Sequence, residues 1–520
     1  MENIERKTSF FKAKFVSKIT ELGEYSFSQP LNVVILGAGF GGLCMAIQLK
    51  EAGINNFIIL EKSDNVGGTW YFNNYPGCAC DVQSHLYSYS FEGKTDWTKR
   101  YGSSSEIQKY IVDLTEKYQL RKNIIFNHEV ISAQFEEENA LWDIKTKNNL
   151  KLQAYHLVVA SGPLHVPNIP NIKGIENFKG RIFHSSNWDH NYSLIGKRVA
   201  SIGTGGSAIQ YLPEIAPLVS QLDVYQRSPA WVIPRDERKY SLFTKNIFKK
   251  FPSIRKVYRN RLYWSNELRL IPIVQPLTAK ISGKFVKQFI KIQVKDKELI
   301  KKLTPNYLLG CKRILISNRY YPTFNKGNVA LITDQIKEIS NYSIITVDGK
   351  ERFVDCIILG TGFIVDPRIY MKDFICKGLN NKSLIEDWAN SAEAYYGVSV
   401  AGYPNMWQII GPNSGLGHNS IIFMIEAQCK YIIQAMKLLK KKNADYMHVK
   451  KNTQTNFNIR LQEKINKTVW NSGCSSWYQQ ENGKNVALWP YSTWRYWLET
   501  RRVNSKDYIF GYSSNSNRYC

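Results

Sequence analysis

Two glycine-rich turns, each placed directly after an apolar strand, constrain this 520-residue chain more than any other feature. The first lies within residues 31–49, where the strand LNVVIL leads into GAGFGG and then into a helix-like run of small and apolar residues. The second lies within residues 197–210, where RVASI leads into GTGGS and another helix-like run. A strand, a glycine turn and a helix in this order begin a βαβ unit whose helix N-terminus can face a phosphate. The sequence therefore predicts two dinucleotide-binding units.

Each glycine of the first turn has its own physical role. Gly37 permits the tight turn, Gly39 lets the backbone approach a pyrophosphate, and Gly42 lets the helix pack closely on the strand. A second apolar strand, residues 57–60, ends at Glu61, at the distance expected for a carboxylate that bonds ribose hydroxyls. This context favours a bound dinucleotide over a purely structural turn.

The loop that follows Glu61 indicates which dinucleotide the first unit holds. Gly68, Thr69 and Trp70 are succeeded by further aromatic residues and by a turn that ends at Asp81. Glycines followed by rigid aromatics are typical of a loop that wraps a flat ring, so we expect this loop to line a flavin and the nucleotide to be FAD. The alternative is that Trp70 is an ordinary core aromatic.

The second turn predicts a different nucleotide. The residues expected to contact its phosphates are Gly203, Thr204, Gly205 and Ser207. After the next strand, residues 222–225, the acid expected for NAD is replaced by Gln226 and Arg227. A guanidinium can bond a ribose 2′-phosphate that a carboxylate would repel, so we infer NADPH. The alternative is a surface arginine at a strand end.

Two further apolar strands end in small residues, as strands do beside a nucleotide. One leads to Ser161 and Gly162, and the other, within residues 353–363, leads to Gly360 and Gly362. We expect both ends to cross near the junction of the two nucleotides, with the second strand returning the chain to the first unit.

The predicted fold is α/β, with two Rossmann-like domains and the NADPH domain inserted in a split FAD domain. The expected division is an N-terminal extension (1–30), the first half of the FAD domain (31–165), the NADPH domain (166–345) with a helical basic insert (237–302), and the second half of the FAD domain with the C-terminal segment (346–520).

Cysteine usage indicates a reducing compartment. The nine cysteines are scattered and odd in number, which fits free thiols in the cytoplasm better than a disulfide framework. Cys78 and Cys80 lack the spacer common to flavin-linked disulfide reductases, so we expect no redox disulfide between them. No stretch approaches the roughly 18 to 20 apolar residues that a membrane span requires, and the first thirty residues contain no continuous apolar run. We expect no bound metal.

The net charge of +26 is concentrated in one region. Residues 237–302 contain about 18 Lys and Arg against about four acids, interleaved with aromatic residues. This basic insert either docks on an anionic membrane surface or other phosphate-rich ligand, or is a solvated helical face. No helix-turn-helix, zinc-finger or RNA-recognition signature accompanies the charge, so we expect no nucleic-acid partner.

One short segment between the two turns carries a family resemblance. Residues 178–189, FKGRIFHSSNWD, match the FxGxxxHxxxW(P/D) fingerprint of Baeyer-Villiger monooxygenases at every fixed position. Residues 67–81 match that family's second long motif, GGxW to YPGxxxD, and the similarity extends from about residue 31 to the C-terminus. The chain therefore resembles this family within the single-component flavin-containing monooxygenases.

The resemblance implies an activity and assigns residues to it. Reduced flavin would react with O2 to give a C4a-peroxide, which inserts oxygen next to a ketone carbonyl and yields an ester or lactone. By resemblance, Arg313 is the catalytic arginine that holds the peroxide anion, Asp81 positions it, and Lys312 joins Arg227 at the NADPH phosphate. His184 and Trp188 belong to a linker that couples domain motion rather than to the chemistry. His418 is expected where a helix N-terminus meets the flavin, or as part of a plain helix cap.

The chain departs from the family pattern at three places. Gly360 stands where the family usually has alanine, Ala79 where arginine is common, and Ile314 where proline is frequent. The missing arginine puts the substrate preference in doubt.

Two other functions compete with ketone oxygenation. An N- or S-oxygenating flavin monooxygenase is disfavoured by Trp188 and Arg313, because its fingerprint usually lacks that tryptophan and its chemistry needs no arginine beside a peroxide anion. The third possibility is a non-catalytic nucleotide sensor docked on membranes through the basic insert. The sequence identifies neither the ketone nor the oligomeric state.

Overall fold

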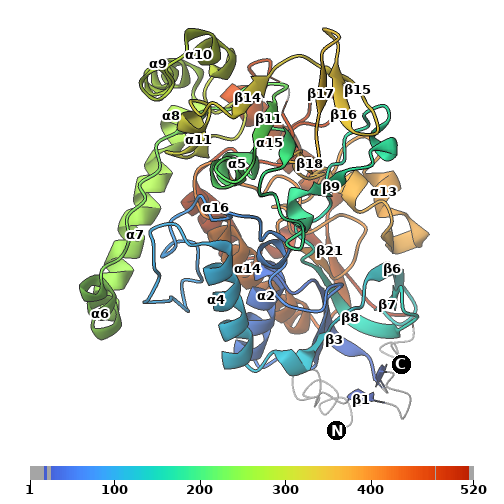
Figure 1. Cartoon of the computed structure of the whole chain (residues 1–520). Coiled ribbons are helices and arrows are strands. Elements are labelled where there is room, and N and C mark those ends of the chain that lie inside the picture. Colours follow the sequence, from blue (N-terminus) through green and yellow to red (C-terminus); the bar gives the residue numbers. More distant parts are fainter. Residues whose placement is uncertain (1–16, 20–24, 28, 475, 515–520) are drawn as a thin grey trace.

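The computed structural model describes residues 17–19, 25–27, 29–474 and 476–514, and its elements form two α/β units side by side (Figure 1). Residues 1–16 of the expected N-terminal extension lie outside the described residues. Within that extension, β1 (Ser17–Ile19) and β2 (Tyr25–Phe27) pair antiparallel.

The first unit is built on an eight-stranded sheet. Seven strands follow the order β19-β6-β7-β8-β3-β4-β5, and β20 pairs with β8. Strands β3, β4, β5 and β8 run parallel to their neighbours in that group, whereas β6, β7 and β8 form an antiparallel meander. The bounds are β3 (Leu31–Leu36), β4 (Phe57–Leu60), β5 (Ile124–Ile125), β6 (Val130–Glu136), β7 (Leu141–Thr146), β8 (Lys151–Val159), β19 (Ile375–Lys377) and β20 (Met406–Gln408).

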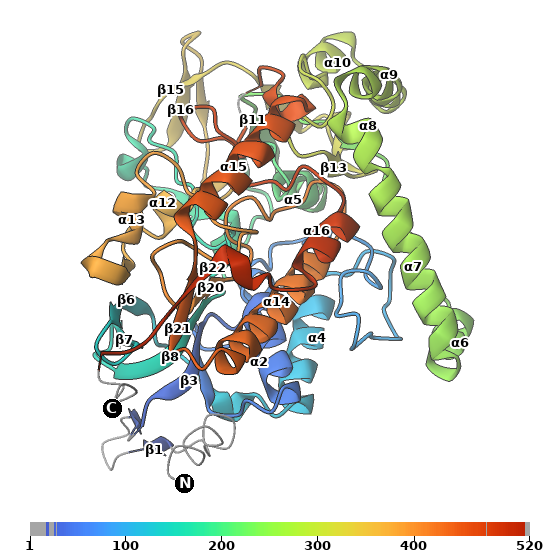
Figure 2. The same cartoon turned by 180° about the vertical axis from the view of Figure 1, so that it is seen from behind.

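Strand β3 is buried along its whole length because the sheet is covered on both faces. On one face α2 (Phe40–Glu51) packs against the long α14 (Ile421–Lys441), which in turn contacts α16 (Thr493–Thr500). Helix α4 (Ser104–Lys117) and the short α3 (Thr69–Phe72) pack together beside them. Figure 2 shows α14 and α16 from behind, in front of the sheet.

The second unit is built on a five-stranded sheet of order β14-β11-β10-β18-β9, in which all the pairs are parallel. The bounds are β9 (Arg181–His184), β10 (Arg198–Ile202), β11 (Gln221–Tyr225), β14 (Val329–Ile332) and β18 (Cys356–Leu359). Helix α5 (Ala208–Ile215) follows β10. A small antiparallel sheet of β15 (Ile336–Ile339), β16 (Ser343–Thr346) and β17 (Glu351–Phe353) lies beside it.

The expectation for residues 353–363 is wrong in one respect. Strand β18 does not return the chain to the first sheet, because it pairs with β10 and with β9 in the second. The sequence could not reveal this, since a short apolar strand fits the interior of either parallel sheet. We therefore propose that the second half of the FAD domain begins after Gly362 rather than at residue 346.

The chain crosses between the units through two segments that lie next to each other. Pro167 and Phe363 form an antiparallel bridge, Ile364 donates its N–H to the Val166 carbonyl at 2.9 Å, and Asn168 donates to the Gly362 carbonyl at 2.9 Å. This paired crossing directly follows the two strand ends, at Gly162 and Gly362, that are expected to cross near the nucleotides.

The basic insert forms a helical arm on one side of the molecule (Figures 1 and 2). Its helices are α6 (Leu242–Lys250), α7 (Pro252–Leu268), α8 (Leu270–Val274), α9 (Pro276–Gln293) and α10 (Lys297–Leu303). Among the described residues, no helix is both long enough and apolar enough to span a bilayer.

The remaining strands and helices lie outside the two main sheets. Strands β12 (Val232–Ile233) and β13 (Leu315–Ile316) pair parallel beside α11 (Tyr320–Thr323), and β21 (Tyr446–Val449) pairs antiparallel with β22 (Tyr508–Gly511). The other helices are α12 (Pro367–Tyr370), α13 (Leu384–Asp387) and α15 (Lys451–Asn466).

The expectation of free cysteines is also corrected. Cys311 and Cys474 form a disulfide across 163 residues of sequence, a pairing that their scattered positions concealed. Six other described cysteines are free and buried, and Cys78 and Cys80 are among them.

Candidate active site

The first glycine turn leaves an open cradle at the N-terminus of α2. Gly37 has φ of +99° and lies so close to the end of β8 that a Cβ there would approach the Ala160 carbonyl oxygen to 2.9 Å. A Cβ on Gly42 would lie 1.9 Å from the Gly37 oxygen. A Cβ on Gly39, by contrast, would meet no atom nearer than the Cα of Gly68, at 3.7 Å, and Gly39 gives the helix no side-chain cap. The first N–H groups of α2 are thus free to bond an anion, which fits a dinucleotide pyrophosphate.

Glu61 is buried at the end of β4 and lies against this turn. Its Oε2 accepts a hydrogen bond from the Ala38 N–H at 2.7 Å, and its Oε1 accepts from the N–H and hydroxyl of Ser63 at 2.9 and 2.8 Å. A carboxylate can accept about four hydrogen bonds, so Glu61 keeps capacity for a ribose hydroxyl.

The aromatic loop packs against both units. Trp70 is buried in α3 next to Gly68 and Thr69, and its indole N–H donates to the Tyr87 hydroxyl at 3.2 Å. Farther along this loop, Gln210 of α5 donates to the Ala79 carbonyl at 3.0 Å and accepts from the Ala79 N–H at 3.1 Å. Gln210 therefore ties the segment before Asp81 to the helix that follows the second turn.

The second turn repeats the geometry of the first. Gly203 has φ of +108°, and a Cβ there would lie 2.4 Å from the Gly360 oxygen. A Cβ on Gly205 would meet no atom within 4 Å, and Ser207 begins α5 without a side-chain cap. Thr204 is buried and donates its hydroxyl to the Ser228 carbonyl at 3.4 Å. This turn also fits a phosphate group at its open glycine.

Two cations meet beside the second turn. Lys312 donates to the Ser228 hydroxyl at 3.1 Å, and its ammonium lies 4.9 Å from the centre of the Tyr307 ring. Burial lowers the pKa of Lys312, and the nearby charge of Arg227 lowers it further. Of the residues that the structure describes, none forms an ion pair with either cation. Two neighbouring cations without a carboxylate are suited to a phosphate monoester.

Asp81 and Arg313 meet although 232 residues separate them in the chain. Both the Nε and the Nη2 of Arg313 donate to Oδ2 of Asp81, at 3.2 and 2.5 Å. Burial alone would raise the pKa of Asp81, but the guanidinium outweighs it and holds that pKa below its usual value. The carboxylate in turn raises the pKa of Arg313. The pair is therefore fully charged, and Arg313 keeps 40% of its side chain exposed for a further ligand.

Two residues at this pair escaped the sequence analysis. The Arg235 guanidinium contacts the Cys80 carbonyl at 3.5 Å and lies 4.9 Å from the Tyr101 ring, and its charge also favours the ionised form of Asp81. Only 14% of its side chain is exposed. Tyr478 is buried close to Arg313, and burial raises its pKa to about 12. Arg235 could not be singled out in the sequence because it lies next to a segment rich in Lys and Arg. Tyr478 could not be singled out because only tertiary packing brings it close to Arg313.

His184 and Trp188 both have their partners in the second unit or at the crossing. His184 accepts the Ser186 N–H on Nδ1 at 3.1 Å, so its proton lies on Nε2, which donates to the Gly362 carbonyl at 3.0 Å. Burial lowers the pKa of His184, which favours this neutral form. The Trp188 ring packs at 5.1 Å from Phe183 and 5.4 Å from Tyr211. These partners are not those of the Asp81–Arg313 pair, so a coupling role stays the prediction for both residues.

His418 lies near the start of α14 and bonds an acid of the helical arm. Its Nε2 is 3.2 Å from the Glu267 carboxylate, and the neighbouring Asn419 donates to the same oxygen at 2.6 Å. The cap of α14 is Ser420, whose hydroxyl accepts the Ile422 N–H. His418 is thus close to the helix terminus, as expected, without capping it.

Several known proteins are similar to this chain over most of its length. A family model described as pyridine nucleotide-disulphide oxidoreductase matches residues 34–261. A Baeyer-Villiger monooxygenase of Pseudomonas aeruginosa is 42% identical, covering 92% of this chain and 90% of the relative. An FAD-binding monooxygenase of Aspergillus niger is 37% identical, covering 94% of this chain and 83% of the relative. A solved structure of an oxidized steroid monooxygenase bound to NADP superposes with a TM-score of 0.84 at 26% identity, covering 93% of this chain and all of the other.

Proposed function

Because the chain belongs to the Baeyer-Villiger monooxygenases, we propose that it inserts one atom of O2 beside a ketone carbonyl, with FAD and NADPH as cofactors. The observation that carries this proposal is the charged Asp81–Arg313 pair beside the loop that joins both glycine turns. The relatives support this reading over oxygenation of nitrogen or sulfur.

The residues present fit both cofactors. Gly37, Gly39, Gly42, Glu61, Gly68, Thr69 and Trp70 would hold FAD, and Gly203, Thr204, Gly205, Ser207, Arg227 and Lys312 would hold NADPH. Bound FAD would activate O2 after reduction by NADPH. The two neighbouring cations would bond the 2′-phosphate of NADPH, which NADH lacks.

Arg313 would supply the electrostatic contribution to the reaction. Its guanidinium cannot lose its proton, and Asp81 strengthens that property by raising its pKa. Negative charge develops on the ketone oxygen when a nucleophilic oxygen adds to the carbonyl, and a fixed cation stabilises it most where water is scarce. Asp81 would hold the guanidinium in one orientation through two hydrogen bonds to the same oxygen.

The central test removes this cation. Replacing Arg313 with Ala is expected to lower ester formation by on the order of 100-fold or more, while flavin content and NADPH binding stay close to wild type. The measurement is product analysis by gas chromatography from a panel of ketones and a panel of sulfides, with NADPH and O2.

The matched control is Arg238→Ala, which removes an exposed arginine paired with Asp236 on the surface. It should leave the ester yield unchanged. Sulfoxide as the sole product of the wild-type protein, with no ester from any ketone, would transfer the proposal to the heteroatom-oxygenating class.

His184, Trp188 and Gly362 would couple the two units rather than take part in the chemistry. The His184–Gly362 hydrogen bond joins the end of β9 to the crossing that leads out of β18. The chain passes between the two units at this crossing, so we propose that these residues couple domain motion to NADPH binding.

The helical arm is proposed to touch an anionic membrane surface. In α9, the exposed apolar residues Leu277, Ile281, Phe285 and Ile292 recur every four or seven residues and form one stripe. A parallel stripe of exposed lysines flanks it, at 280, 284, 287 and 291. In α7, Ile254, Val257, Trp264 and Leu268 form a second exposed apolar stripe.

Apolar stripes bordered by lysines match the two layers of an anionic bilayer surface, in which acyl chains lie beneath phosphate groups. We propose a cytoplasmic protein that binds such a surface peripherally. The alternative remains a solvated face of the arm.

Vesicle co-sedimentation tests the contact. The wild-type protein should bind vesicles that contain phosphatidylserine at low salt and should lose that binding as salt rises, because surface charge is screened. The pair Leu277→Ser and Phe285→Ser should reduce binding at every salt concentration. Lys147→Gln with Lys151→Gln, which neutralises exposed lysines far from the arm, is the control and should not. Equal sedimentation with neutral vesicles, or none at low salt, would restore the alternative.

A further inference from the structure

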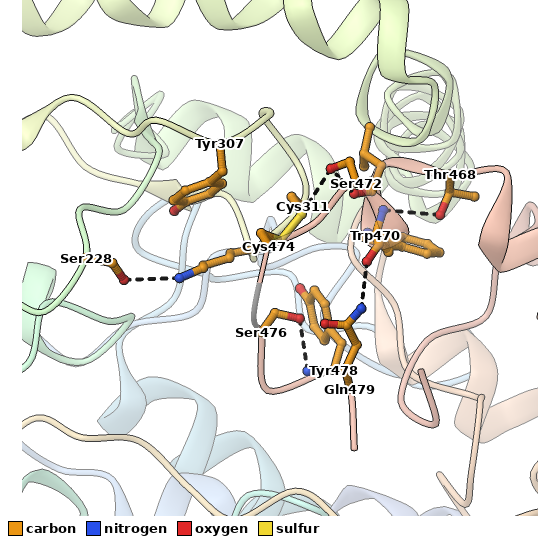
Figure 3. The surroundings of a disulfide bond; sticks show 12 residues. Ser228, Tyr307, Cys311, Thr468, Trp470, Ser472, Cys474, Ser476, Tyr478 and Gln479 are labelled. Carbon is orange, nitrogen blue, oxygen red and sulfur yellow. Dashed lines mark hydrogen bonds between the residues drawn. A yellow bond between two sulfur atoms is a disulfide. The ribbon is translucent and has the colours of Figure 1, made fainter. Parts of the chain in front are cut away.

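The Cys311–Cys474 disulfide joins two segments that meet only through tertiary structure (Figure 3). Cys311 lies between α10 and β13, in the second unit, and Cys474 follows α15 in the C-terminal segment. Their Cα atoms are 6.3 Å apart. The bond is thus a covalent tie between stretches of the chain that carry different portions of the site.

On one side the tie ends directly before Lys312 and Arg313. These two side chains point to different partners, Lys312 to Ser228 and Arg313 to Asp81. The backbone before them makes one turn, in which the Cys311 N–H donates to the Leu308 carbonyl at 3.1 Å, and the Trp231 indole N–H donates to the Tyr307 carbonyl at 3.1 Å. β13, which follows, is only two residues long. Few other contacts of regular structure fix this segment, so a covalent bond at Cys311 has a large share in its placement.

On the other side the tie ends four residues before Tyr478. Tyr478 is buried and lies close enough to Arg313 to affect its electrostatics. Gln479 donates to the Trp470 carbonyl at 3.1 Å, and Gln480 donates to both oxygens of Asp366 at 3.0 Å. Figure 3 shows the disulfide above Tyr478, with Ser228 and Tyr307 to the left of the disulfide.

We propose that Cys311 and Cys474 are positioning residues for Lys312 and Arg313, and that reduction of their bond by a dithiol releases this segment. In the oxidised protein Lys312 is hydrogen-bonded to Ser228 and Arg313 to Asp81. In the reduced protein the two cations remain present but are held less firmly. The consequence for turnover rests on the proposed function, whereas the release of the segment does not.

The chemistry of the switch balances with a small dithiol. One thiolate of the dithiol attacks the sulfur of Cys474 and breaks the S–S bond, and Cys311 leaves as a thiolate that takes up a proton. The second thiol of the reagent then closes its own disulfide and frees the Cys474 thiol. Hydrogen peroxide reverses the change, forming one S–S bond and two water molecules from two thiols.

Solvent access and hydrogen bonding favour attack at the sulfur of Cys474, with Cys311 as the leaving thiolate. Cys474 keeps 9% of its surface exposed, whereas Cys311 has none. The Ser472 hydroxyl lies 3.3 Å from Sγ of Cys311 and 2.6 Å from the Val469 carbonyl, so it can turn its one proton toward the departing thiolate. The other described cysteines are free and buried, so none of them forms a second disulfide that would change the thiol count.

The first measurement does not depend on turnover. Thiol titration of denatured protein should find two fewer free thiols before treatment with dithiothreitol than after it. Hydrogen exchange of peptides that cover residues 305–316 and 472–480 should then become faster after reduction. Peptides of β3 and β10 should be unaffected, because those strands are sheltered in their sheets.

The second measurement follows ester formed per NADPH consumed. Reduction should lower this ratio by about threefold or more, since a shift of ~1 Å in a catalytic group can cost on the order of 100-fold in rate. A disulfide with a merely structural role would lower the melting temperature and leave the ratio unchanged well below that temperature.

Variants distinguish the effect of losing the disulfide from other effects of dithiothreitol. Cys474→Ser should show the reduced values without dithiothreitol and should not respond to it, and Cys311→Ser should behave in the same way. Cys474→Ser is the safer variant because Cys474 is less deeply buried than Cys311. Cys376→Ala, which removes a free buried cysteine of β19, should respond to the reagent as the wild-type protein does.

Equal exchange rates in the oxidised and reduced protein, or an equal thiol count, would overturn the proposal. A change in exchange with an unchanged product ratio would overturn the positioning role and leave a structural tie. If no form of the protein makes ester, the proposed function fails, but hydrogen exchange still decides whether the tie holds the segment.

Discussion

A single missing methyl group distinguishes Gly360 from the alanine that the family usually has there. A Cβ at this position would lie 2.4 Å from the Tyr211 hydroxyl, which in turn shares a hydrogen bond of 2.8 Å with Ser201. Tyr211 also packs against Trp188. Glycine at position 360 therefore leaves room for the Tyr211 hydroxyl. Packing alone accounts for the departure from the family's alanine, and no catalytic reason is needed.

This pairing predicts the outcome of Gly360→Ala. The variant should lose about 1–3 kcal/mol in the free energy of unfolding, the usual cost of overpacking, as measured by urea denaturation. In the Tyr211→Phe background, Gly360→Ala should cost much less in the free energy of unfolding, because the clashing hydroxyl is gone. Gly327→Ala, at a position where a Cβ meets no atom within 4 Å, serves as the control. An equal loss with and without the hydroxyl would instead implicate Ala208, whose Cβ would lie 3.3 Å away.

At the scale of elements, one buried acid of the helical arm collects hydrogen bonds from two helices of the first unit. Glu267, near the end of α7, accepts hydrogen bonds from His418 and Asn419 before α14 and from Thr493 at the start of α16. Thr493 contributes both its hydroxyl, at 2.6 Å, and its N–H, at 3.1 Å. Three helices therefore converge on one carboxylate.

The Glu267 contact predicts a pH-dependent stability. Burial raises the pKa of this carboxyl, but the hydrogen bonds from His418 and Thr493 outweigh it, so the folded pKa lies below the ordinary value of 4.5. The folded state thus binds its proton more weakly than the unfolded state does. The stabilisation is complete above pH 4.5 and declines as the pH falls through the folded pKa.

The variant that tests this contact is Glu267→Gln. It should lose about 1–3 kcal/mol in the free energy of unfolding at pH 7, because charged hydrogen bonds are replaced and one acceptor is lost. The gap in the free energy of unfolding between variant and wild type should narrow as the pH falls below 4.5 and through the lowered folded pKa. Glu298→Gln, an exposed acid of α10 paired with Lys301, should show almost no loss. A constant gap across this range would mean that the carboxyl is neutral in the folded protein.

At the scale of the whole molecule, local patterns were sufficient for some features and insufficient for others. The two glycine turns could be predicted because a strand, a turn and a helix are specified within about 20 residues. The meeting of Asp81 with Arg313 came only from the family resemblance, since 232 residues separate them. The sheet to which β18 belongs, the disulfide and the place of Arg235 depend on how distant segments pack, and no local pattern encodes that.

The helical arm likewise combines a feature that the sequence predicts with one that only the structure shows. Its composition predicted a basic helical insert, and the structure places helices at residues 242–303. The stripes of exposed apolar residues appear only when the buried face of each helix is known, because Val286 and Ile290 on the inner side of α9 are as apolar as Phe285 on the outer.

The paired crossing at Pro167 and Phe363 also matters for how such a chain can be rebuilt. The whole second unit, arm included, leaves and returns through neighbouring backbone, so it is one continuous insertion whose two ends adjoin. Units whose two ends adjoin tolerate insertion at one site of a host, and a graft of this unit must also keep the contacts that Glu267 and Arg313 make with the rest of the chain. A graft of this unit carries Cys311, so its disulfide can form only if the host supplies a cysteine where this chain has Cys474.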